Sequence, residues 1–432
     1  MLVGTQIRRV AVIGGTRIPF ARGNGAYANL SCQDLLTASL IGVVERFNLR
    51  GKRLGDVIGG AVLKHSKDFN LVRESVLSSG LDRQTPGLDV QRACGTSLEA
   101  AIEIGNKIAL GQIDCGVACG VDSVSDPPIV YSKGFQQVLM RAHRARSALQ
   151  RFSAFLGLRP GYFIPVFPGT NEPRTHLSMG QSCELMAKTW KVTRQEQDQL
   201  ACDSHLHAAA AWSSGFFDDL VVPCNGLISD NNVRPDTSLQ KLAALQPAFD
   251  KSATGTLTAG NSTPLTDGAS AALLASEDWA RANNLPVQAW LTYGKQWAVD
   301  FVSGAEGLLM APAYAVAAML KDAGLTLQDF DYYEIHEAFA AQVLCTLKAW
   351  ESADFCRDRL GLAKPLGSID RNKLNVNGSS VAVGHPFAAT GTRIVATLAK
   401  LLSNNPAAKR GLISVCTAGG MGVTAILERN NC

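Results

Sequence analysis

Two cysteines and two histidines lie where apolar, strand-like stretches end, and side chains at such junctions point into crevices. Cys94 lies in QRACGTSLEA, His336 in YYEIHEAFAAQ, His385 in SSVAVGHPFAATG and Cys416 in ISVCTAGGMG. A thiol beside an imidazole is a pair suited to nucleophilic acyl transfer. Each residue alone also fits a structural role, as a small core side chain or a hydrogen-bonded core histidine, so the chemical prediction depends on their convergence.

Cys94 follows a strand-like stretch and precedes a helical pattern. Thr96 and Glu99 have the spacing of a capping box, which predicts that the helix begins beside Cys94. Unpaired N–H groups and the positive end of the helix dipole favour a thiolate at such a place. We predict a nucleophile here; a small residue filling a tight turn is an equally weighted alternative for this loop taken alone.

His385 occupies a corresponding place near the C-terminus, between Gly384 and Pro386 and just before another helical pattern. A single histidine in a glycine-rich turn is more often structural than catalytic. If the two halves of the chain are related by a pseudo-twofold axis, however, the loops of Cys94 and His385 meet. The imidazole would then face the thiol and act as its base.

The elements around these residues repeat along the chain. Apolar periodicity predicts strands and helices in the same order in an N-terminal part and in residues 278–432. The predicted strands are Val10–Gly14, Asp56–Gly60, Leu88–Gln91, Ala269–Ala275, Asp331–Ile335 and Val423–Leu427, and the predicted helices include Leu35–Phe47, the stretch after Cys94, the stretch up to Trp350 and the one after Asn375–Gly384. This alternation predicts an α/β fold built from two duplicated halves.

Between the halves the periodicity breaks down. We expect an N-terminal half at 1–125 that is completed by about 251–277, a loop domain at 126–250, and a C-terminal half at 278–432. Within the insert, the run from Pro127 to Asn171 carries six Lys or Arg residues and no Asp or Glu, together with several aromatic residues. So many exposed aromatics would be unusual for a solvated loop. The run therefore predicts an amphipathic segment, 131–170, that faces a partner or a membrane surface.

Composition excludes other classes of protein. The 432 residues are 46% apolar, and no uninterrupted apolar run approaches a membrane span or a signal peptide, which predicts a cytoplasmic protein. The net charge of +4 is too slight to indicate nucleic acid. The cysteines number eleven and are scattered, and the spacing of Cys115 and Cys119 is poor for zinc. We expect reduced thiols and predict no metal site.

Taken together, the four motifs resemble those of thiolases. Q-x-x-C-G-T-S around Cys94, H-E-A-F-A at 336–340, G-H-P at 384–386 and C-T-A-G-G-M-G at 416–422 match, in order, the active-site motifs of that family. The stretch T-A-G-N-S-T-P-L-T-D-G-A at 258–269 resembles the one that contacts coenzyme A. His336, where many thiolases have Asn, and the basic insert resemble the thiolase subunits of fatty-acid β-oxidation trifunctional complexes.

The resemblance implies the duplicated, five-layered αβαβα thiolase fold with an inserted loop domain. It implies that Cys94 becomes acylated with His385 as base, that His336 and His385 hold the enolate oxygen, and that Cys416 moves the proton at carbon. Backbone N–H groups of Cys94 and Ala418 would form a second oxyanion hole. Many thiolases have Gly where Ala418 stands, and a strained φ there would be harder for Ala.

The resemblance also implies substrate contacts. Thr263 stands where some members use Ser to contact pantetheine, while Met179 and Phe339 match positions along the pantetheine and acyl tunnel, with a plain core role as the alternative. Coenzyme A is a co-substrate, and no tightly bound cofactor is expected. We expect acyl-CoA substrates, a homodimer or tetramer, and no nucleic acid. A complex with an enoyl-CoA hydratase/3-hydroxyacyl-CoA dehydrogenase chain and peripheral membrane contact through 131–170 are further expectations.

The function predicted from this resemblance is a 3-ketoacyl-CoA thiolase of fatty-acid β-oxidation. One alternative is an acetoacetyl-CoA thiolase working in the synthetic direction. A more distant one is a non-catalytic acyl-CoA-binding or scaffold subunit, which would have lost polar groups that this chain keeps. Ketoacyl synthases share the fold but pair their cysteine with two histidines and lack a second catalytic cysteine, so Cys416 favours a thiolase.

Overall fold

A computed structural model describes residues 7–429. Its strands form one hydrogen-bonded sheet in the order β4-β3-β5-β6-β1-β7-β10-β9-β8, with β2 beside β6. The N-terminal half contains β1 (Val10–Arg17), β2 (Ala21–Arg22), α1 (Cys32–Arg46), β3 (Asp56–Gly59), α2 (Leu71–Ser78), β4 (Gly87–Asp89), α3 (Thr96–Ala109), β5 (Cys115–Asp122) and β6 (Thr266–Ser276). The C-terminal half contains α9 (Glu277–Ala282), β7 (Ala289–Ala298), α10 (Ala311–Ala323), β8 (Tyr332–Ile335), α11 (Ala340–Glu351), α12 (Ala353–Asp358), α13 (Ser380–Val383), α14 (Thr390–Asn404), β9 (Arg410–Thr417) and β10 (Met421–Glu428).

The strand pairings confirm the duplication. In the N-terminal half β1 pairs antiparallel with β6, β6 antiparallel with β5, and β5 parallel with β3. In the C-terminal half β7, β10, β9 and β8 follow with the same sequence of directions. Strand β4, parallel to β3, has as its counterpart only a single parallel bridge between Tyr333 and Leu374. The loops that carry Cys94 and His385 therefore leave equivalent places in the two halves.

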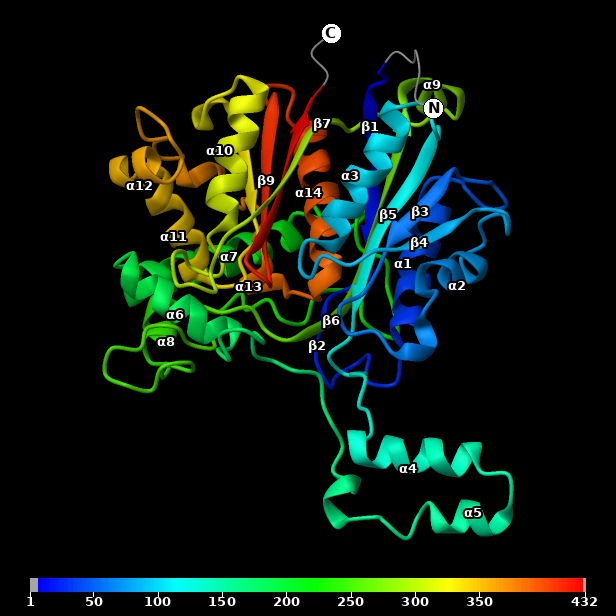
Figure 1. The fold of residues 1–432 in the computed structure, drawn as a ribbon. Helices are drawn as coiled ribbons and strands as arrows, with labels where there is room; N and C mark the ends of the chain where they lie inside the picture. The colour runs from blue at the N-terminus through cyan, green and yellow to red at the C-terminus, as the bar shows by residue number, and fades with distance from the viewer. Residues whose placement is uncertain (1–6, 430–432) are drawn as a thin grey trace.

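The layers follow the expected αβαβα arrangement (Figure 1). Helices α1 and α2 cover the outer face of the N-terminal strands, and α10 packs on the outer side of the C-terminal strands, with α11 against it. Helices α3 and α14 pack against each other and against strands of both halves, and thus form the middle layer. Within the sheet, the strands of the two halves are joined at Ala11 and Val12 of β1, which pair with Trp290 and Ala289 of β7.

Small residues let the middle layer close. A Cβ atom added at Gly391 in α14 would lie 2.2 Å from the backbone nitrogen of Leu98 in α3. A Cβ at Gly120 in β5 would lie 2.0 Å from the carbonyl oxygen of Ala388. These contacts bring the start of α14, just after His385, against the first turn of α3, just after Cys94. The duplication and the close approach of the two helices thus determine where the candidate site forms.

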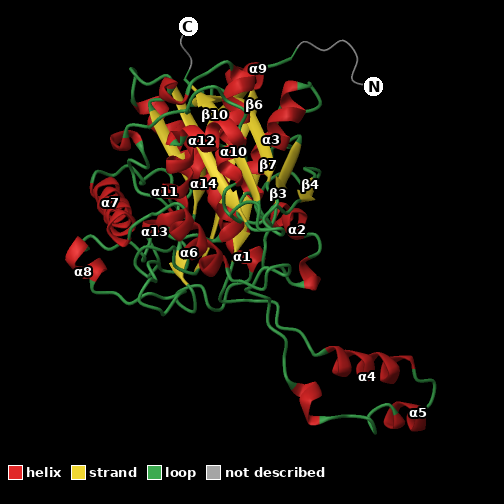
Figure 2. Ribbon diagram, turned by 60° about the vertical axis from the view of Figure 1, so that its left-hand side comes forward, coloured by secondary structure: helices red, strands yellow, loops and turns green. Residues whose placement is uncertain are grey.

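The intervening region contains α4 (Lys133–Arg144), α5 (Ala148–Ser153), α6 (Met179–Thr189), α7 (Arg194–Ser213) and α8 (Leu239–Ala243). Helices α6 and α7 begin with capping boxes at Ser178/Gln181 and Thr193/Glu196. They lie against the C-terminal half, whereas α4 and α5 project away from the body on two adjacent chain segments (Figures 1 and 2). A buried bidentate pair of Arg17 with Asp230, at 2.5 and 2.7 Å, ties this region to β1.

Across residues 7–429 no helix combines the length and the apolar character needed to cross a bilayer. The ten cysteines within that range are all free thiols, as expected from their scatter. Most are buried, so they pack as small apolar side chains. Cys94 and Cys224 are the partly exposed members of the described set.

Candidate active site

Cys94 lies in the short turn between β4 and α3. Ala93 before it has a left-handed backbone, with φ of 44°, which is uncommon for a residue with a side chain. The predicted capping box is wrong: Gly95 is the N-cap and has no side-chain cap, while the Thr96 hydroxyl accepts from the Arg92 N–H and donates to the Ala93 carbonyl. Thr96 thus braces the turn of the thiol rather than the helix end, and Glu99 pairs with Arg92 instead.

The thiol of Cys94 is not the low-pKa thiol that the helix dipole suggested. Removal from water raises its pKa to about 12, because burial penalises the charged thiolate more than the local dipoles favour it. The backbone N–H groups of Ala418 and of Cys94 itself act in the opposite direction and favour the thiolate, so both lie on the side of the sulfur. This thiol is therefore neutral at rest and needs a base to give up its proton.

Ala418 lies in the turn between β9 and β10, which begins directly after Cys416 and Thr417. Positive φ values occur at Gly419 (79°) and Gly420 (69°), and Ala418 is not among the positive-φ residues. The departure from Gly at 418 therefore introduces no left-handed alanine. The N–H group of Ala418 still reaches the Cys94 sulfur, so the backbone donor expected at this position is present.

His336 follows β8 and is fully buried. Its Nδ1 lies 2.8 Å from the Ser380 hydroxyl oxygen, and that oxygen accepts a hydrogen bond from Arg393 Nη2 at 2.9 Å. Because arginine only donates, the Ser380 proton is free to point at Nδ1, which places the imidazole proton on Nε2. Burial, and then the neighbouring His385 and Arg393, lower the pKa of His336 well below its usual value. The ring is a neutral N–H donor.

His385 is held in the equivalent loop of the C-terminal half. Its backbone N–H donates to the Thr266 hydroxyl at 2.8 Å, and its Nδ1 lies 2.6 Å from the Thr390 hydroxyl at the start of α14. Burial lowers its pKa to about 3, with Arg393 adding to the effect. Gly384 before it has φ of 105°, so glycine is required at that position.

The two loops meet as the duplication predicted. A ligating atom from each of Cys94, His336 and His385 lies within 4.8 Å of the others, and the imidazole centroids are 4.1 Å apart. Both Nε2 atoms are buried and have no hydrogen-bond partner, so they are available to a substrate. Cys416, at the end of β9, is 1% exposed and close enough to Cys94 that Cys94 adds to burial in raising the pKa of Cys416. Both thiols and both imidazoles thus face one small space.

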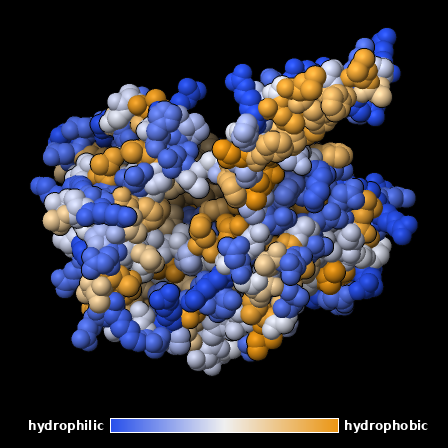
Figure 3. All heavy atoms as spheres, turned by 90° about the horizontal axis from the view of Figure 1, so that it is seen from below, coloured by the Kyte–Doolittle hydropathy of each residue, from blue (hydrophilic) through white to orange (hydrophobic). Residues whose placement is uncertain are grey.

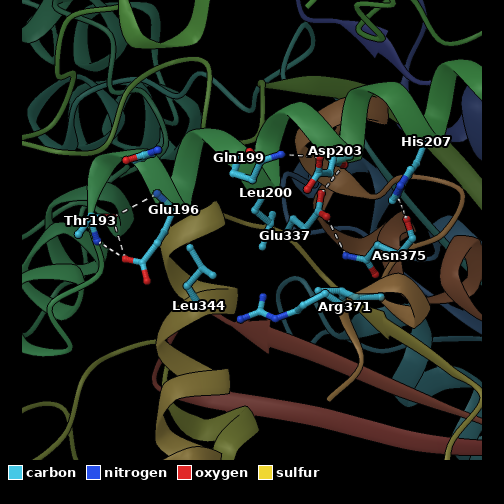
Figure 4. Close-up of a pocket in the computed structure, with 13 residues that line it drawn as sticks. Thr193, Glu196, Gln199, Leu200, Asp203, His207, Glu337, Leu344, Arg371 and Asn375 are labelled. Carbon is cyan, nitrogen blue, oxygen red and sulfur yellow. Dashed lines mark hydrogen bonds between the residues drawn. The ribbon is translucent and has the colours of Figure 1, made fainter. Parts of the chain in front are cut away.

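Several positioning residues were not predicted from the sequence. Ser380 and Thr390 fix the two rings, and Glu337, next to His336, accepts from Ser204, from the Val381 N–H and from Asn375 at 2.7 Å. Figure 4 shows Glu337 and Asn375 at one side of a hollow of about 530 Å³ between α7 and α11. The catalytic cluster does not line that hollow. Hydroxyl residues on both sides of the G-H-P motif were the available signal for Ser380 and Thr390.

The three residues expected to contact substrate differ in their surroundings. The Thr263 hydroxyl donates to the Ser380 carbonyl at 2.8 Å, which links the predicted pantetheine position to the support of His336. Phe339 is buried with its ring edge-on to Phe249, with centroids 5.7 Å apart. Met179 is half-buried against the same core. Their contact with substrate stays a prediction.

Comparison with known proteins agrees with this geometry. Residues 10–278 match the model of the thiolase N-terminal domain, and residues 290–429 match that of the thiolase C-terminal domain. The chain is 39% identical to 3-ketoacyl-CoA thiolases of Yersinia pestis and Yersinia pseudotuberculosis, over 99% of this chain and 98% of each relative.

Solved structures agree over the same length. The acetyl-CoA acetyltransferase of Bacillus anthracis matches with a TM-score of 0.81 at 29% identity, covering 98% of this chain and all of that one. The human mitochondrial 3-ketoacyl-CoA thiolase matches with a TM-score of 0.80 at 28% identity over 99% of this chain and all of that one, and its complex with CoA matches equally well over 98% and 99%. With both family domains matched end to end, the chain belongs to the thiolase family.

Proposed function

We propose that this protein is a 3-ketoacyl-CoA thiolase. It would cleave a 3-ketoacyl-CoA with coenzyme A, yielding acetyl-CoA and an acyl-CoA shortened by the departing unit. The observation that carries the proposal is the convergence of a braced but uncharged thiol with two neutral imidazoles whose Nε2 atoms are free. The relatives named 3-ketoacyl-CoA thiolase over nearly the full length of this chain support the same reaction.

The first half-reaction requires a nucleophile at C3 and a place for the electrons that leave on C2. The Cys94 sulfur attacks the C3 ketone and its proton passes to His385 Nε2, which is needed because the thiol is neutral at rest. The C2–C3 bond then breaks; the acyl group stays on sulfur as a thioester, and the bonding pair leaves as the enolate of acetyl-CoA. Nε2–H groups of His336 and His385 stabilise the enolate oxygen, and Cys416 protonates C2.

The second half-reaction restores the protons. The Cys416 thiolate takes the proton of the coenzyme A thiol, and the coenzyme sulfur attacks the acyl thioester. Backbone N–H groups of Cys94 and Ala418 hold the oxygen of that tetrahedral intermediate. Cys94 then leaves and regains its proton from His385. Coenzyme A enters as a co-substrate, with Thr263, Met179 and Phe339 proposed along its pantetheine and acyl path, and the cycle uses no bound metal or cofactor.

The test is thiolysis of acetoacetyl-CoA by wild type, Cys94→Ser and Cys224→Ser. A serine hydroxyl is a far weaker nucleophile than a thiolate, so we expect Cys94→Ser to lose roughly 10³-fold or more in kcat. Cys224 is the other partly exposed cysteine of the described chain and contacts Tyr27, outside the cluster; its variant should keep normal turnover. Near-normal turnover by Cys94→Ser, or no acyl-enzyme of the expected mass, contradicts the assignment.

A second candidate is synthesis of acetoacetyl-CoA from acetyl-CoA. The match to the Bacillus anthracis acetyl-CoA acetyltransferase favours it. The same groups run the reaction in either direction, so acyl-chain length separates the candidates. Rates that rise from acetoacetyl-CoA to medium- and long-chain 3-ketoacyl-CoA support a degradative role in fatty-acid β-oxidation, whereas activity restricted to acetoacetyl-CoA supports the synthetic one.

The projecting segment supports a proposal of its own. We propose that 126–250 is a loop domain whose residues 131–170 touch the surface of an anionic membrane. Apolar side chains stand in solvent along this segment, including Leu149 (78% exposed), Leu156 (73%) and Phe152 (67%). Figure 3 shows hydrophobic side chains over much of the face of the projection that is seen in that view. The basic residues here have no acidic residue among them, a combination that suits anionic headgroups above an apolar layer.

Sedimentation with vesicles tests this contact. Vesicles containing phosphatidylglycerol should bind the wild type more strongly than neutral phosphatidylcholine vesicles. Phe152→Ser with Leu156→Ser should lose most binding to both, and Arg144→Glu with Arg146→Glu should lose the preference for anionic lipid. Vesicle binding that is unchanged in both double variants contradicts the proposal. Retained thiolysis in each variant serves as the folding control.

Assembly is proposed from the edge of the sheet. Strand β4 is an edge strand with Leu88 exposed, and Phe69 and Leu77 are exposed near it. Edge strands of this kind pair readily with a second copy, and the Cys94 loop follows β4 directly. We propose a homodimer, or a tetramer made of two such dimers, that also binds an enoyl-CoA hydratase/3-hydroxyacyl-CoA dehydrogenase chain. Native mass measurement of wild type and Leu88→Lys, followed by co-purification with such a chain, tests both. A monomeric wild type contradicts the first part, and failure of the two chains to co-purify the second.

A further inference from the structure

Three residues of the active site, one cysteine and two histidines, have the composition of a metal site. Cys94, His336 and His385 come from three separate segments, so no motif spacing announces them. In the fold, a thiol and two imidazole nitrogens lie within 4.8 Å of one another. One cysteine and two histidines with a fourth position open is a ligand set that Zn²⁺ accepts.

Two observations independent of that clustering point to a ligand. The Nε2 atoms of His336 and His385 are buried and have no partner within the described chain. On the other side of each ring, Nδ1 is held by a hydroxyl, Ser380 for His336 and Thr390 for His385, at 2.8 and 2.6 Å. In metal-binding histidines the second ring nitrogen donates its N–H to such a partner, so these hydroxyl oxygens can hold the rings once the imidazole proton is on Nδ1.

From this arrangement we propose that the thiol of Cys94 and the Nε2 atoms of His336 and His385 bind Zn²⁺ reversibly, and that the bound metal blocks the site. Tetrahedral zinc holds such atoms roughly 3.4 to 3.6 Å apart. Ligands within 4.8 Å need only small side-chain movements to reach that spacing. Binding forms three metal–ligand bonds and releases the thiol proton to solvent. It also moves the His336 proton from Nε2 to Nδ1, where the Ser380 oxygen accepts it.

The consequence is competition with substrate. Zinc would occupy the attacking sulfur and both enolate-oxygen donors at once, so an acyl-CoA and the metal exclude each other. The ring positions are the same in both cases, but an oxyanion accepts from Nε2–H whereas zinc binds the unprotonated Nε2 of the other tautomer. This inference depends on the geometry alone. Zinc binding can therefore be disproved while the proposed reaction holds, and the proposed reaction can be disproved while zinc binding holds.

Cobalt substitution reads the site directly. Co²⁺ added to the reduced, metal-free protein should give the visible bands of tetrahedral cobalt and a near-ultraviolet thiolate-to-cobalt band, and Zn²⁺ should abolish both. Cys94→Ser should lose the thiolate band, whereas Cys224→Ser should keep it. A wild type without these bands, or a thiolate band that survives in Cys94→Ser, overturns the proposal. Loss of the thiolate band only in Cys416→Ser would mean that Cys416 is the sulfur ligand, and this also overturns the proposal.

Alkylation of the wild type avoids any concern that a variant misfolds. With peptide mass mapping, saturating Zn²⁺ should slow iodoacetamide labelling of Cys94 by roughly tenfold or more, because coordination removes the free thiolate. Labelling of Cys224 in the same sample is the internal control. A chelator should restore the rate at Cys94. Equal labelling of Cys94 with and without zinc contradicts the inference even if turnover is normal.

Discussion

The two halves of the molecule use the same topology but hold their reactive groups differently. In the N-terminal half, the Cys94 sulfur is held by backbone N–H groups, including that of Ala418. In the C-terminal half, each imidazole is fixed by a hydroxyl, from Ser380 or Thr390. A nucleophile must move onto a substrate carbon, whereas donors to a developing oxyanion act best when already in place. The two halves thus differ in their supports: the thiol has only backbone N–H groups beside it, whereas each imidazole is fixed by a side-chain hydroxyl.

The two loops also differ in backbone structure and in length. The strand before Cys94 is a complete β4, and Ala93 takes a left-handed conformation. The counterpart before His385 is a single bridge at Leu374, followed by a longer loop with α13 and a left-handed Gly384. The extra residues bring in Ser380, so the added length is what equips the second loop to orient His336.

Removal of the base should give the largest effect. His385→Ala deletes both the acceptor of the Cys94 proton and one donor to the enolate oxygen. General-base and oxyanion contributions together predict a loss of about 10⁴-fold in kcat. Initial rates of thiolysis with KM for acetoacetyl-CoA check this, and KM should change little. A loss of less than tenfold would mean that Cys94 ionises without this ring.

The join between the halves should be next most sensitive. Gly391→Ala places a Cβ against the backbone of Leu98, where neither helix can yield easily. Overpacking at such a contact costs about 2 to 3 kcal/mol, measured as the free energy of unfolding in urea. Gly161→Ala in the projecting segment has open space around it and is the control. If the two variants were equally stable, close α3–α14 packing would not be what holds the loops together.

Sequence patterns predicted the fold more completely than they predicted the electrostatics of the site. Periodicity located β1, α1, β8 and α14, and the repeat predicted that the loops of Cys94 and His385 would meet, because these features depend on local apolar spacing and on symmetry. The capping box at Thr96 and Glu99 was wrong because Thr96 instead closes the turn around Ala93, a choice made by the backbone conformation there.

The expected thiolate at Cys94 was wrong for a related reason. Helix N-terminus arguments count the dipole but not the water that the folded halves exclude, and burial dominates the pKa of this thiol. The same exclusion lowers the pKa of His385. Likewise Ser380 and Arg393, thirteen residues apart, act on His336 only after folding. Burial and long-range contacts of this kind leave no local pattern in a single sequence.

The fixed role of the second loop can be tested with neighbouring serines. Ser380→Ala removes the hydroxyl that holds His336 Nδ1, so the ring can take the wrong tautomer, and we expect about a tenfold loss in kcat with little change in KM. Ser379→Ala is the matched control, since its hydroxyl makes long bonds to the Ile335 carbonyl (3.4 Å) and from Arg393 Nη2 (3.3 Å) and holds neither imidazole. Ser380→Thr, which restores a hydroxyl, should recover part of the rate. Equal effects of Ser379→Ala and Ser380→Ala would point to a general packing defect.

The smallest predicted effect is on the pH dependence of the unfolding free energy, which should differ between variants of the two halves. Because the pKa of His385 is lowered from 6.5 to about 3, the ring is neutral when folded and protonated when unfolded below pH 6.5. Above pH 6.5 this histidine is neutral in both states and costs no folding free energy. As the pH falls below 6.5, only the unfolded state binds the proton, so the folded state becomes less stable. Between pH 6.5 and about 5.5 the wild type should lose about 1 kcal/mol of unfolding free energy relative to His385→Asn. The pKa of Cys94 is raised instead, to about 12, so its thiol is protonated in both states throughout this range. The stability difference between wild type and Cys94→Ser should therefore stay constant over the same urea titrations, and a matching slope in both variants would show that the two loops do not differ in this way.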